Sequence, residues 1–376
     1  MNYNSEKKRV IVFHEYGEPK HYVGLSMLIK NNSWETEKYI EFSPIKLFVK
    51  AILSKQYAKA LKALYDLVFI IFCYLFPFVL RGRIAVIGIA PLDAKLLFMR
   101  RVLSKCIIVY HSSWLYWDGT KYPKNNIFFK KATEECWRGF LTRDVSSFAT
   151  VTDKVALEIQ DNFNISEQKF TVVYHAFDEK IFTCHSIEVV DIPSVIYAGR
   201  LVESKGIDLI LKLAQLHPSI RFEFAGQGPL EGIIREKAKV LSNIVCHGFI
   251  SKPEQLARVF NRSQIVVLPS QRTETWEELF GIALIEAMAC GCVPITTDHY
   301  GPSVIFDNSE LLHHCFDEQS FYNNADQAIN TLFSNPEKLR HYRQLAIDSA
   351  TRFNLLSISK AWEQVISNAL HNSEQS

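Results

Sequence analysis

Short apolar runs alternate along this chain with longer segments in which apolar residues recur at helical spacing. In the first half, continuous apolar runs predict buried strands at 10–13, 84–89, 106–110, 148–152 and 170–174. Helices are expected between them at 94–104, 125–140 and 154–163. Strands that alternate with helices in this way are typical of a doubly wound parallel sheet.

The pattern is lost between residues 177 and 193 and then begins again, which predicts a linker followed by a second unit. Strands are expected in the second half at 195–198, 221–225, 244–247, 265–268 and 293–297. The helices expected there lie at 207–216, 230–241, 253–261, from about 279 to 291, and in closing segments that reach residue 370. A chain of 376 residues is long enough for about two domains. The sequence therefore predicts two similar open α/β units that face each other.

One segment of the first half is unusually apolar. Residues 67–80 form a run of 14 residues without a charge, interrupted by Pro77. In the preceding stretch, apolar and basic side chains would lie on opposite faces of a helix, the apolar ones being Leu53, Tyr57, Leu61 and Leu64 and the basic ones Lys55, Lys59 and Lys62. Three interpretations are open for 67–80: a buried core helix, an element lying in a membrane surface, and a membrane span, which needs about 20 residues.

Charge is divided unevenly between the two halves. Residues 1–187 carry 26 Lys and Arg against 18 Asp and Glu, a balance of +8, whereas residues 188–376 carry 16 against 22, a balance of −6. The first half is therefore the one expected to meet an anionic surface. The eight cysteines form no C-x-x-C pair, which favours reduced thiols in the cytosol, and the first apolar run is too short for a signal peptide.

The stretch from 272 to 294 contains two glutamates, Glu278 and Glu286, with seven residues between them. A helix that begins near residue 279 and ends at Gly291 would place Glu278 at its mouth and Glu286 within it. The free amides of the first helical turn would suit an anion such as a sugar diphosphate, with the carboxylates near its hydroxyls. The alternative interpretation is an amphipathic surface helix with two solvated acids.

Other candidate groups follow strands of the second half directly. Arg200 and Lys205 leave the strand at 195–198 beside glycines, and two such cations suit a diphosphate, although solvated loop cations would show the same pattern. Two further loops could approach a nucleotide or line a base pocket, and their candidate residues are Gly226, Gly228, Pro229, His247 and Phe249. Ligands gather at the carboxyl ends of strands in an open parallel sheet, so these loops are expected to lie together.

The first half offers two candidates of the same kind. Gly17 follows the strand at 10–13 and could bring backbone amides to a phosphate, or it could mark an ordinary turn before Pro19. His111 follows the strand at 106–110, where active-site groups collect, although a structural histidine would occupy the same place.

Taken together, these segments resemble the group 1 glycosyl transferases, retaining enzymes of family 4 with the GT-B fold. The matching segments of the second half are IYAGRLVESKGIDLIL, FAGQGPL and PSQRTETWEELFGIALIEAMACGCVPITT. The first half matches more loosely, at VIVFHEYGEP, IIVYHSS and VVYHAFDEKIF. His175 and Ala176 stand where the family often has Asn-Gly, and only Gly17 remains of the frequent Gly-Gly pair in the first loop.

The resemblance implies a GT-B architecture of two facing Rossmann-like doubly wound sheets with a cleft between them. The acceptor-binding domain would span 1–185 and the donor-binding domain 186–354, with a helix at about 355–376 packed back on the first domain. Arg200 and Lys205 would hold the diphosphate, Glu278 would contact the sugar hydroxyls, and His111 would help to position the sugar. The remaining donor contacts would come from Glu286 at the ribose, from the backbone amides of Phe280 and Gly281, and from Gly17, Gly226, Gly228, Pro229, His247 and Phe249.

The implied activity is transfer of a sugar from a nucleoside diphosphate, UDP or GDP, to a lipid-linked or polysaccharide acceptor with retention of configuration, as in lipopolysaccharide and other cell-surface glycans. No metal or other cofactor would be needed, in agreement with the lack of a D-x-D pair. A sugar-nucleotide epimerase of the same fold and a non-catalytic relative that binds carbohydrate or a membrane surface are the alternatives. The expected location is the cytoplasm, with peripheral contact to the inner face of the membrane through the basic first domain, and no nucleic-acid partner is expected.

Overall fold

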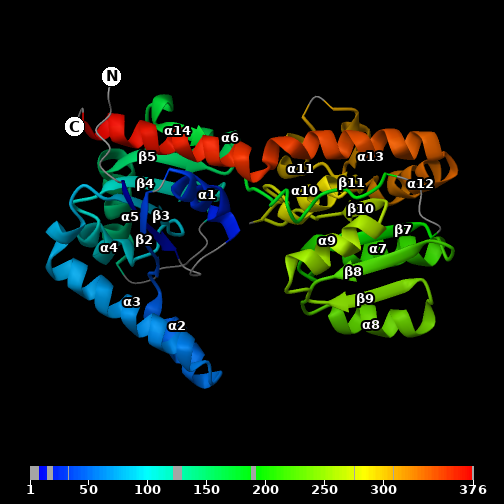
Figure 1. The fold of residues 1–376 in the computed structure, drawn as a ribbon, viewed down its shortest axis with the longest axis horizontal. Helices are drawn as coiled ribbons and strands as arrows, with labels where there is room; N and C mark the ends of the chain where they lie inside the picture. The colour runs from blue at the N-terminus through cyan, green and yellow to red at the C-terminus, as the bar shows by residue number, and fades with distance from the viewer. Residues whose placement is uncertain are drawn as a thin grey trace. The chain divides into compact units, whose positions relative to one another are not determined.

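The computed structural model describes residues 8–14, 20–32, 34–121, 129–187, 192–274, 276–307 and 309–374 (Figure 1). The chain divides into two compact units, of which the first comprises Met1–His175 and Leu356–Ser376 and the second Ala176–Leu355. The first unit ends at His175 and not at residue 185. The physical reason is that Phe177 and Phe182 are buried, and the amide of Phe177 donates to the carbonyl of Phe353 at 3.1 Å, within the second unit.

The first unit is built on a six-stranded sheet whose described pairings are all parallel, in the order β2-β1-β3-β4-β5-β6. Its strands are β1 (Arg9–His14), β2 (Glu35–Glu41), β3 (Ile84–Gly88), β4 (Ile107–Ser112), β5 (Val145–Thr150) and β6 (Phe170–Val172). β2 was not predicted, because its sequence ETEKYIE is mostly polar. It lies at the edge of the sheet and pairs only with β1 among the described strands, where such a composition is tolerated.

Helices flank this sheet, and the last one comes from the end of the chain. They are α1 (Val23–Asn31), α2 (Pro44–Leu53), α3 (Tyr57–Leu75), α4 (Leu96–Val102), α5 (Lys130–Gly139), α6 (Asp153–Phe163) and α14 (Leu355–Glu374). Short 3-10 turns lie at Lys20–Tyr22, Pro77–Leu80 and Glu167–Lys169, and a π-helical turn lies at Phe140–Asp144. The helix expected at 125–140 begins at Lys130, because Phe129 before it adopts a left-handed φ of 61°, and residues 122–128 lie outside the described part.

The basic amphipathic stretch does not form a single helix. Leu53 ends α2, Lys55 turns the chain with a left-handed φ of 56°, and α3 begins at Tyr57. α3 then continues through most of the uncharged run and ends before Pro77, which cannot continue the hydrogen-bond ladder. No helix in the described part of the chain has both the length and the apolar character that crossing a membrane requires.

The second unit has its own parallel sheet, in the order β12-β11-β10-β7-β8-β9. Its strands are β7 (Ser194–Ala198), β8 (Arg221–Ala225), β9 (Ile244–Gly248), β10 (Ile265–Leu268), β11 (Val293–Thr297) and β12 (Cys315–Phe316). Its helices are α7 (Ile207–Leu216), α8 (Glu231–Val240), α9 (Pro253–Arg262), α10 (Ile282–Ala289), α11 (Tyr300–Phe306), α12 (Phe321–Ser334) and α13 (Pro336–Ala350), with 3-10 turns at Glu203–Lys205, Glu310–His314 and Thr351–Phe353. These bounds agree closely with the predicted strands and with the helices predicted before residue 263, whereas β12 was not predicted.

Strand order fixes where each unit can hold a ligand. In the second unit the order reverses between β7 and β10, so the loops that follow these two strands diverge at their carboxyl ends. In the first unit the reversal lies between β1 and β3. Open α/β sheets bind ligands at such switch points, which directs attention to residues 199–206 and 269–281.

Two glycines allow the loops beside this switch point to pack backbone against backbone. A Cβ on Gly226 would lie 1.8 Å from the carbonyl oxygen of Gly199, and one on Gly228 would lie 2.4 Å from that of Leu201. The amide of Leu201 also donates to the carbonyl of Gln227 at 3.0 Å. The glycine turn after β8 therefore has a packing role that the sequence pattern alone did not indicate.

Gly226→Ala is expected to lower the melting temperature, because the new methyl group has to displace the backbone of Gly199. Overpacking of this kind costs about 1–3 kcal/mol, and each kcal/mol corresponds to roughly 2–4 °C in a domain of this size. Gly232→Ala in α8 is the matched control, since a Cβ there meets nothing within 4 Å. Equal melting temperatures for the two variants would contradict this account.

Candidate functional site

A buried ion pair joins the two loops at the switch point of the second unit. Nζ of Lys205, at the end of the loop after β7, contacts Oε2 of Glu278, in the loop after β10. The two side chains are only 10% and 13% exposed. The hydroxyl of Ser270 donates to the same carboxylate oxygen at 3.2 Å. The structure thus brings together two of the predicted catalytic residues.

Trp276 and Gly206 hold this ion pair in place. The ammonium of Lys205 lies over the ring of Trp276, 4.5 Å from its centroid, in a cation–π contact. Gly206 has a left-handed φ of 61°, and a Cβ there would lie 2.1 Å from the carbonyl oxygen of Pro269. The two loops can approach this closely only with glycine at position 206. Trp276 was not predicted, although an aromatic residue beside acids in the loop was visible in the sequence.

Arg200 lies in the same loop as Lys205 but is exposed. The backbone beneath it is fixed, because the hydroxyl of Tyr197 donates to the carbonyl of Arg200 at 2.7 Å. Burial, together with the nearby charge of Glu278, raises the pKa of Tyr197, so the phenol stays protonated and remains a donor. The loop therefore exposes the guanidinium of Arg200 to solvent and keeps the ammonium of Lys205 buried.

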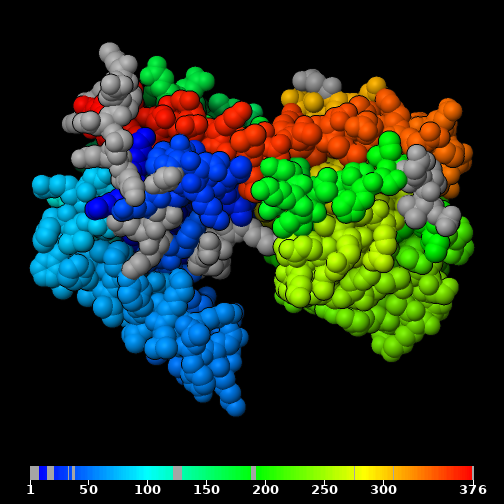
Figure 2. Space-filling model, in the orientation of Figure 1, coloured from blue at the N-terminus to red at the C-terminus, as the bar shows by residue number. Residues whose placement is uncertain are grey.

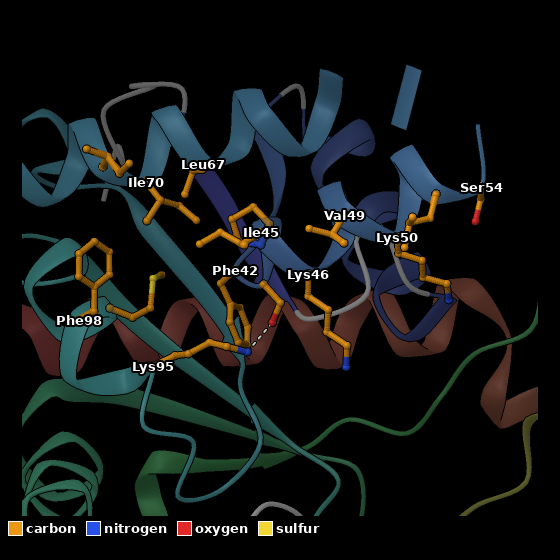
Figure 3. A pocket seen from close by; sticks show the side chains of 15 residues that line it. Phe42, Ile45, Lys46, Val49, Lys50, Ser54, Leu67, Ile70, Lys95 and Phe98 are labelled. Carbon is orange, nitrogen blue, oxygen red and sulfur yellow. Dashed lines mark hydrogen bonds between the residues drawn. The ribbon is translucent and has the colours of Figure 1, made fainter. Parts of the chain in front are cut away.

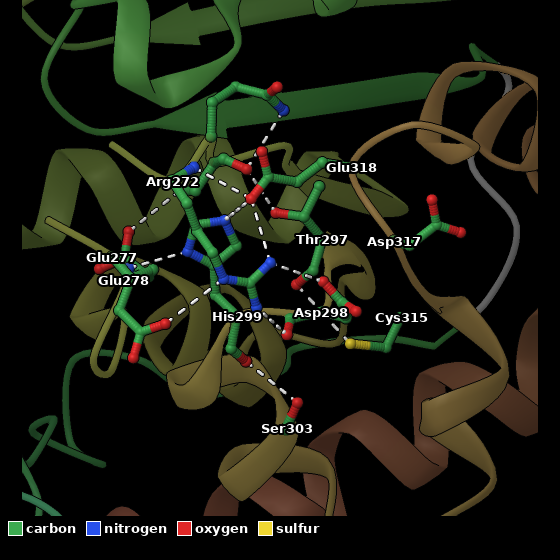
Figure 4. Close-up of polar contacts among 12 residues, drawn as sticks. Arg272, Glu277, Glu278, Thr297, Asp298, His299, Ser303, Cys315, Asp317 and Glu318 are labelled. Atoms are coloured by element: carbon green, nitrogen blue, oxygen red, sulfur yellow. Dashed lines mark hydrogen bonds and ion pairs between the residues drawn. The ribbon is translucent and has the colours of Figure 1, made fainter. Parts of the chain in front are cut away.

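A polar network fixes the backbone of Glu278 (Figure 4). Its amide donates to Nδ1 of His299 at 2.9 Å, so the neutral ring carries its proton on Nε2, which lies 3.1 Å from Oε1 of Glu318. Arg272 contacts the same oxygen of Glu318 at 3.1 Å and Oδ1 of Asp298 at 3.0 Å. Burial, and then the charge of Arg272, lower the pKa of His299 and favour the neutral ring.

The residues that surround Glu278 in this network were not predicted as site residues from the sequence. They are Arg272, Asp298, His299 and Glu318. They lie on three different segments, and their contact depends on β11 and β12 ending beside the loop after β10. The sequence contains only a weak signal for them. Asp298 directly follows β11, and Asp317 directly follows β12.

Helix α10 begins at Ile282 and not near residue 279, because Gly281 adopts a left-handed φ of 110° before the first helical turn. The helix is buried along most of its length, and Glu286 within it is only 7% exposed. The interpretation as a surface helix with two solvated acids is therefore wrong. The ring of Phe280 is buried against Phe353, with centroids 5.3 Å apart, so only its backbone is a candidate for contacting a ligand.

His247 has a partner within the protein. Its Nε2 lies 2.6 Å from Oε2 of Glu223, a buried residue of β8 that also accepts from the hydroxyl of Ser194 at 3.0 Å. Burial alone would raise the pKa of Glu223, but these hydrogen bonds hold it below its ordinary value. The structure thus gives His247 a structural contact, whereas the neighbouring Phe249 is 65% exposed. Pro229 follows the packed glycines in the adjacent turn.

His111 of the first unit belongs to a cluster of four histidines. β4 extends to Ser112, so His111 lies inside the strand, and its Nδ1 lies 3.2 Å from the hydroxyl of Tyr22. Nδ1 atoms of His21 and His175 lie 3.2 Å apart, and the ring of His14 lies 6.3 Å from that of His21. Gly17, the other candidate of this unit, lies outside the described residues.

Burial makes this cluster electrically neutral. Burial first, and the neighbouring histidines second, lower the pKa of His14 to about 4 and that of His111 to about 3. The pKa values of His21 and His175 are lowered for the same main reason. Among the described residues, no group of three or more His, Cys, Asp and Glu is arranged to hold a metal ion.

Two Rossmann-like units with these strand orders define the GT-B fold. The structure of HepE from Anabaena, solved in complex with UDP, matches 96% of this chain and 99% of its own length with a TM-score of 0.61 at 13% sequence identity. Residues 188–348 match the model of the family described as glycosyl transferases group 1. The resemblance to this family is thereby confirmed over the second unit.

Relatives by sequence agree with this family. A phosphatidylinositol N-acetylglucosaminyltransferase component of Arabidopsis thaliana is 28% identical over 223 residues, which are 56% of this chain and 47% of the relative. An N-acetylgalactosaminyltransferase of Campylobacter jejuni, named for a diphospho-undecaprenol acceptor, is 24% identical over 212 residues, 54% of this chain and 55% of the relative. The matched region thus spans about half the length of each of these relatives.

Replacing His299 with Ala is expected to release the loop that carries Glu278, because the amide of Glu278 loses its acceptor. A buried donor without a partner costs about 1–3 kcal/mol. Hydrogen–deuterium exchange should speed up over residues 276–281, and His299→Asn should restore part of the protection. His341→Ala is the control, since that histidine is 53% exposed and contacts Glu310 and the ring of Tyr342, away from the loop that carries Glu278. Unchanged exchange in His299→Ala would refute the positioning role.

The first unit is expected to lose stability as the pH falls from about 6.5 towards 4. At these pH values a histidine with a lowered pKa stays neutral in the folded protein but is protonated in the unfolded chain. Acid therefore favours the unfolded state. His14 alone, with its pKa lowered from 6.5 to about 4, should contribute about 3 kcal/mol over that range. Urea unfolding of the wild type and of His14→Gln at several pH values tests this, and the variant should show a shallower dependence. A free energy of unfolding that is flat across the window would contradict it.

Proposed function

We propose that this protein is a retaining glycosyltransferase of family 4 that transfers a sugar from a nucleoside diphosphate to the hydroxyl of an acceptor. The observation that carries the proposal is the contact between Lys205 and Glu278 at the switch point of the second sheet, with Arg200 exposed in the same loop as Lys205. Cations and a carboxylate are the groups that a sugar diphosphate requires, and the switch point is where such a sheet holds its ligand.

In the proposed reaction, the bond between the anomeric carbon and the β-phosphate oxygen breaks, and its electron pair leaves with the diphosphate. Arg200 and Lys205 stabilise that charge, together with the amide end of α10. Glu278 holds hydroxyls of the sugar, which passes through an oxocarbenium-like state. The acceptor oxygen attacks from the face that the diphosphate leaves, and the acceptor proton passes to the departing phosphate oxygen, so the configuration is retained. These groups supply the positive charge from the protein itself, which supports a reaction that needs no metal.

The remaining donor contacts are proposed as the sequence predicted them. Glu286 binds the ribose hydroxyls, and the backbone amides of Phe280 and Gly281 approach the donor. UDP is favoured as the nucleotide, since the structurally similar HepE was solved with UDP. A lipid-linked acceptor is favoured because the names of two relatives specify phosphatidylinositol and diphospho-undecaprenol. Such an acceptor agrees with a cytoplasmic enzyme that works at the inner face of a membrane in glycan synthesis.

Arg200→Ala is expected to lower kcat by about 10²–10³-fold, because one donor to the leaving group's charge is lost. The residue is exposed, so the fold should tolerate the change. Release of UDP or GDP from candidate sugar nucleotides measures the activity, and a rise in melting temperature with nucleotide measures binding. Lys212→Ala is the matched control, since Lys212 is a solvated cation on α7, 61% exposed and 3.6 Å from Asp208.

Two results would overturn the proposal. One is a protein that neither releases nucleoside diphosphate from any donor nor melts at a higher temperature in its presence. The other is Arg200→Ala that retains wild-type kcat. Lys205→Ala is less suited to this test, because it leaves the buried Glu278 unpaired and destabilises the fold as well.

A further inference from the structure

Helices α2 and α3 expose an unusual number of large apolar side chains. Val49 and Leu53 of α2 are 52% and 79% exposed. On α3, the exposed positions include Leu61, Val68, Phe72 and Leu75, and the first of them is 67% exposed. Figure 2 shows α2 and the first turns of α3 standing away from the rest of the first unit. We refer to these six residues as the α2–α3 apolar surface.

The exposed residues of α3 lie on a single face. Leu61, Val68, Phe72 and Leu75 follow the three- and four-residue spacing of a helix, and so does Tyr65 between them, which is 48% exposed. The other face of α3 is buried in the first unit through Ala63, Ile70 and Cys73. α3 is therefore apolar on two sides, and the first unit covers only one of them.

An apolar groove continues this surface into the protein (Figure 3). It has a volume of about 1050 Å³ and lies among α2, α3 and α4. Phe42, Ile70 and Met99 lie at its buried side, whereas Val49 and Leu53 belong both to its lining and to the α2–α3 apolar surface. A soluble monomer rarely exposes an apolar area of this extent unless something binds there.

The charges around the surface decide between a lipid and a protein partner. Residues 44–83 contain seven basic side chains, Lys46, Lys50, Lys55, Lys59, Lys62, Arg81 and Arg83, against a single acid, Asp66. Asp66 is 2% exposed and pairs with Lys62 at 3.3 Å, so it offsets one of these seven charges and leaves the segment with an excess of six positive charges. Figure 3 shows Lys46 and Lys50 extending from α2 beside the groove.

We propose that the α2–α3 apolar surface docks on an anionic lipid bilayer, with the two helices lying in the interface and the lysines at the level of the lipid phosphates. The apolar residues enter the acyl-chain boundary, and the groove accepts hydrocarbon from the same leaflet. The 19 residues of α3 extend roughly 28 Å, which is long enough to lie along the surface as one continuous element. This inference is independent of the proposed function, because it concerns the first unit and needs no donor nucleotide.

Vesicle co-sedimentation of the full chain tests the inference directly. Vesicles of phosphatidylglycerol mixed equally with phosphatidylcholine are compared with vesicles of phosphatidylcholine alone, with no nucleotide present. The wild type should bind the anionic vesicles and bind the neutral ones weakly. Val68→Glu with Phe72→Glu should lower the binding more than tenfold, since two charges would enter the acyl boundary. Lys46→Gln with Lys50→Gln should lower it roughly 30-fold, as each lysine contributes about 1 kcal/mol near such a surface and every 1.4 kcal/mol is a factor of ten, and added salt should also weaken the binding.

Leu157→Glu on α6 is the matched control, since Leu157 is 54% exposed on another helix of the same unit. It should bind vesicles as the wild type does. Melting curves show whether each variant is folded, and the exposed positions of Val68 and Phe72 make folding of their variant the expected result. Wild-type vesicle binding by Val68→Glu with Phe72→Glu would overturn the inference. So would a wild type that ignores all vesicles but forms a dimer which these substitutions dissociate, because the surface would then join two copies of the chain.

Discussion

The ion pair between Lys205 and Glu278 is the constraint on which the second unit's site depends. Two charges that are nearly buried lose their hydration, and only close partners offset that cost. Ser270 donates to the carboxylate of Glu278 and Trp276 lies under the ammonium of Lys205, while His299 holds the backbone amide of Glu278. A diphosphate that approaches Lys205 would therefore meet a cation whose position is already set. Preorganisation of this kind favours stabilisation of developing charge.

The two units use the same architecture for opposite electrostatic purposes. Both place polar groups near the carboxyl ends of parallel strands. In the second unit these groups are charged and paired, around Lys205 and Glu278. In the first unit they are histidines kept neutral by burial, around His111. A neutral, closely packed imidazole can orient a hydroxyl without adding charge, which agrees with the expectation that His111 helps to position the sugar.

The uncharged run at 67–80 is only partly the core helix that the sequence left open. Ile70 and Cys73 belong to the core, whereas Val68 and Phe72 face solvent. α3 packs one apolar face against the first unit and exposes the other. The basic excess of the first half is partly concentrated around that second face. Composition and structure thus point to the same side of the first unit.

The sequence by itself determined most of the strands and helices, the division into two α/β units and most of the candidate residues, because hydrophobic periodicity and turn chemistry are local properties. Tertiary structure alone decided which groups meet. Lys205 and Glu278 are 73 residues apart in sequence, and their contact follows from β7 and β10 being neighbours in the sheet. The same holds for His299 beneath Glu278 and for Glu223 beside His247, a contact that changes how His247 is interpreted. Strand order, the packing of glycine loops and the choice of which face of α3 is buried all depend on long-range contacts, which no local pattern contains.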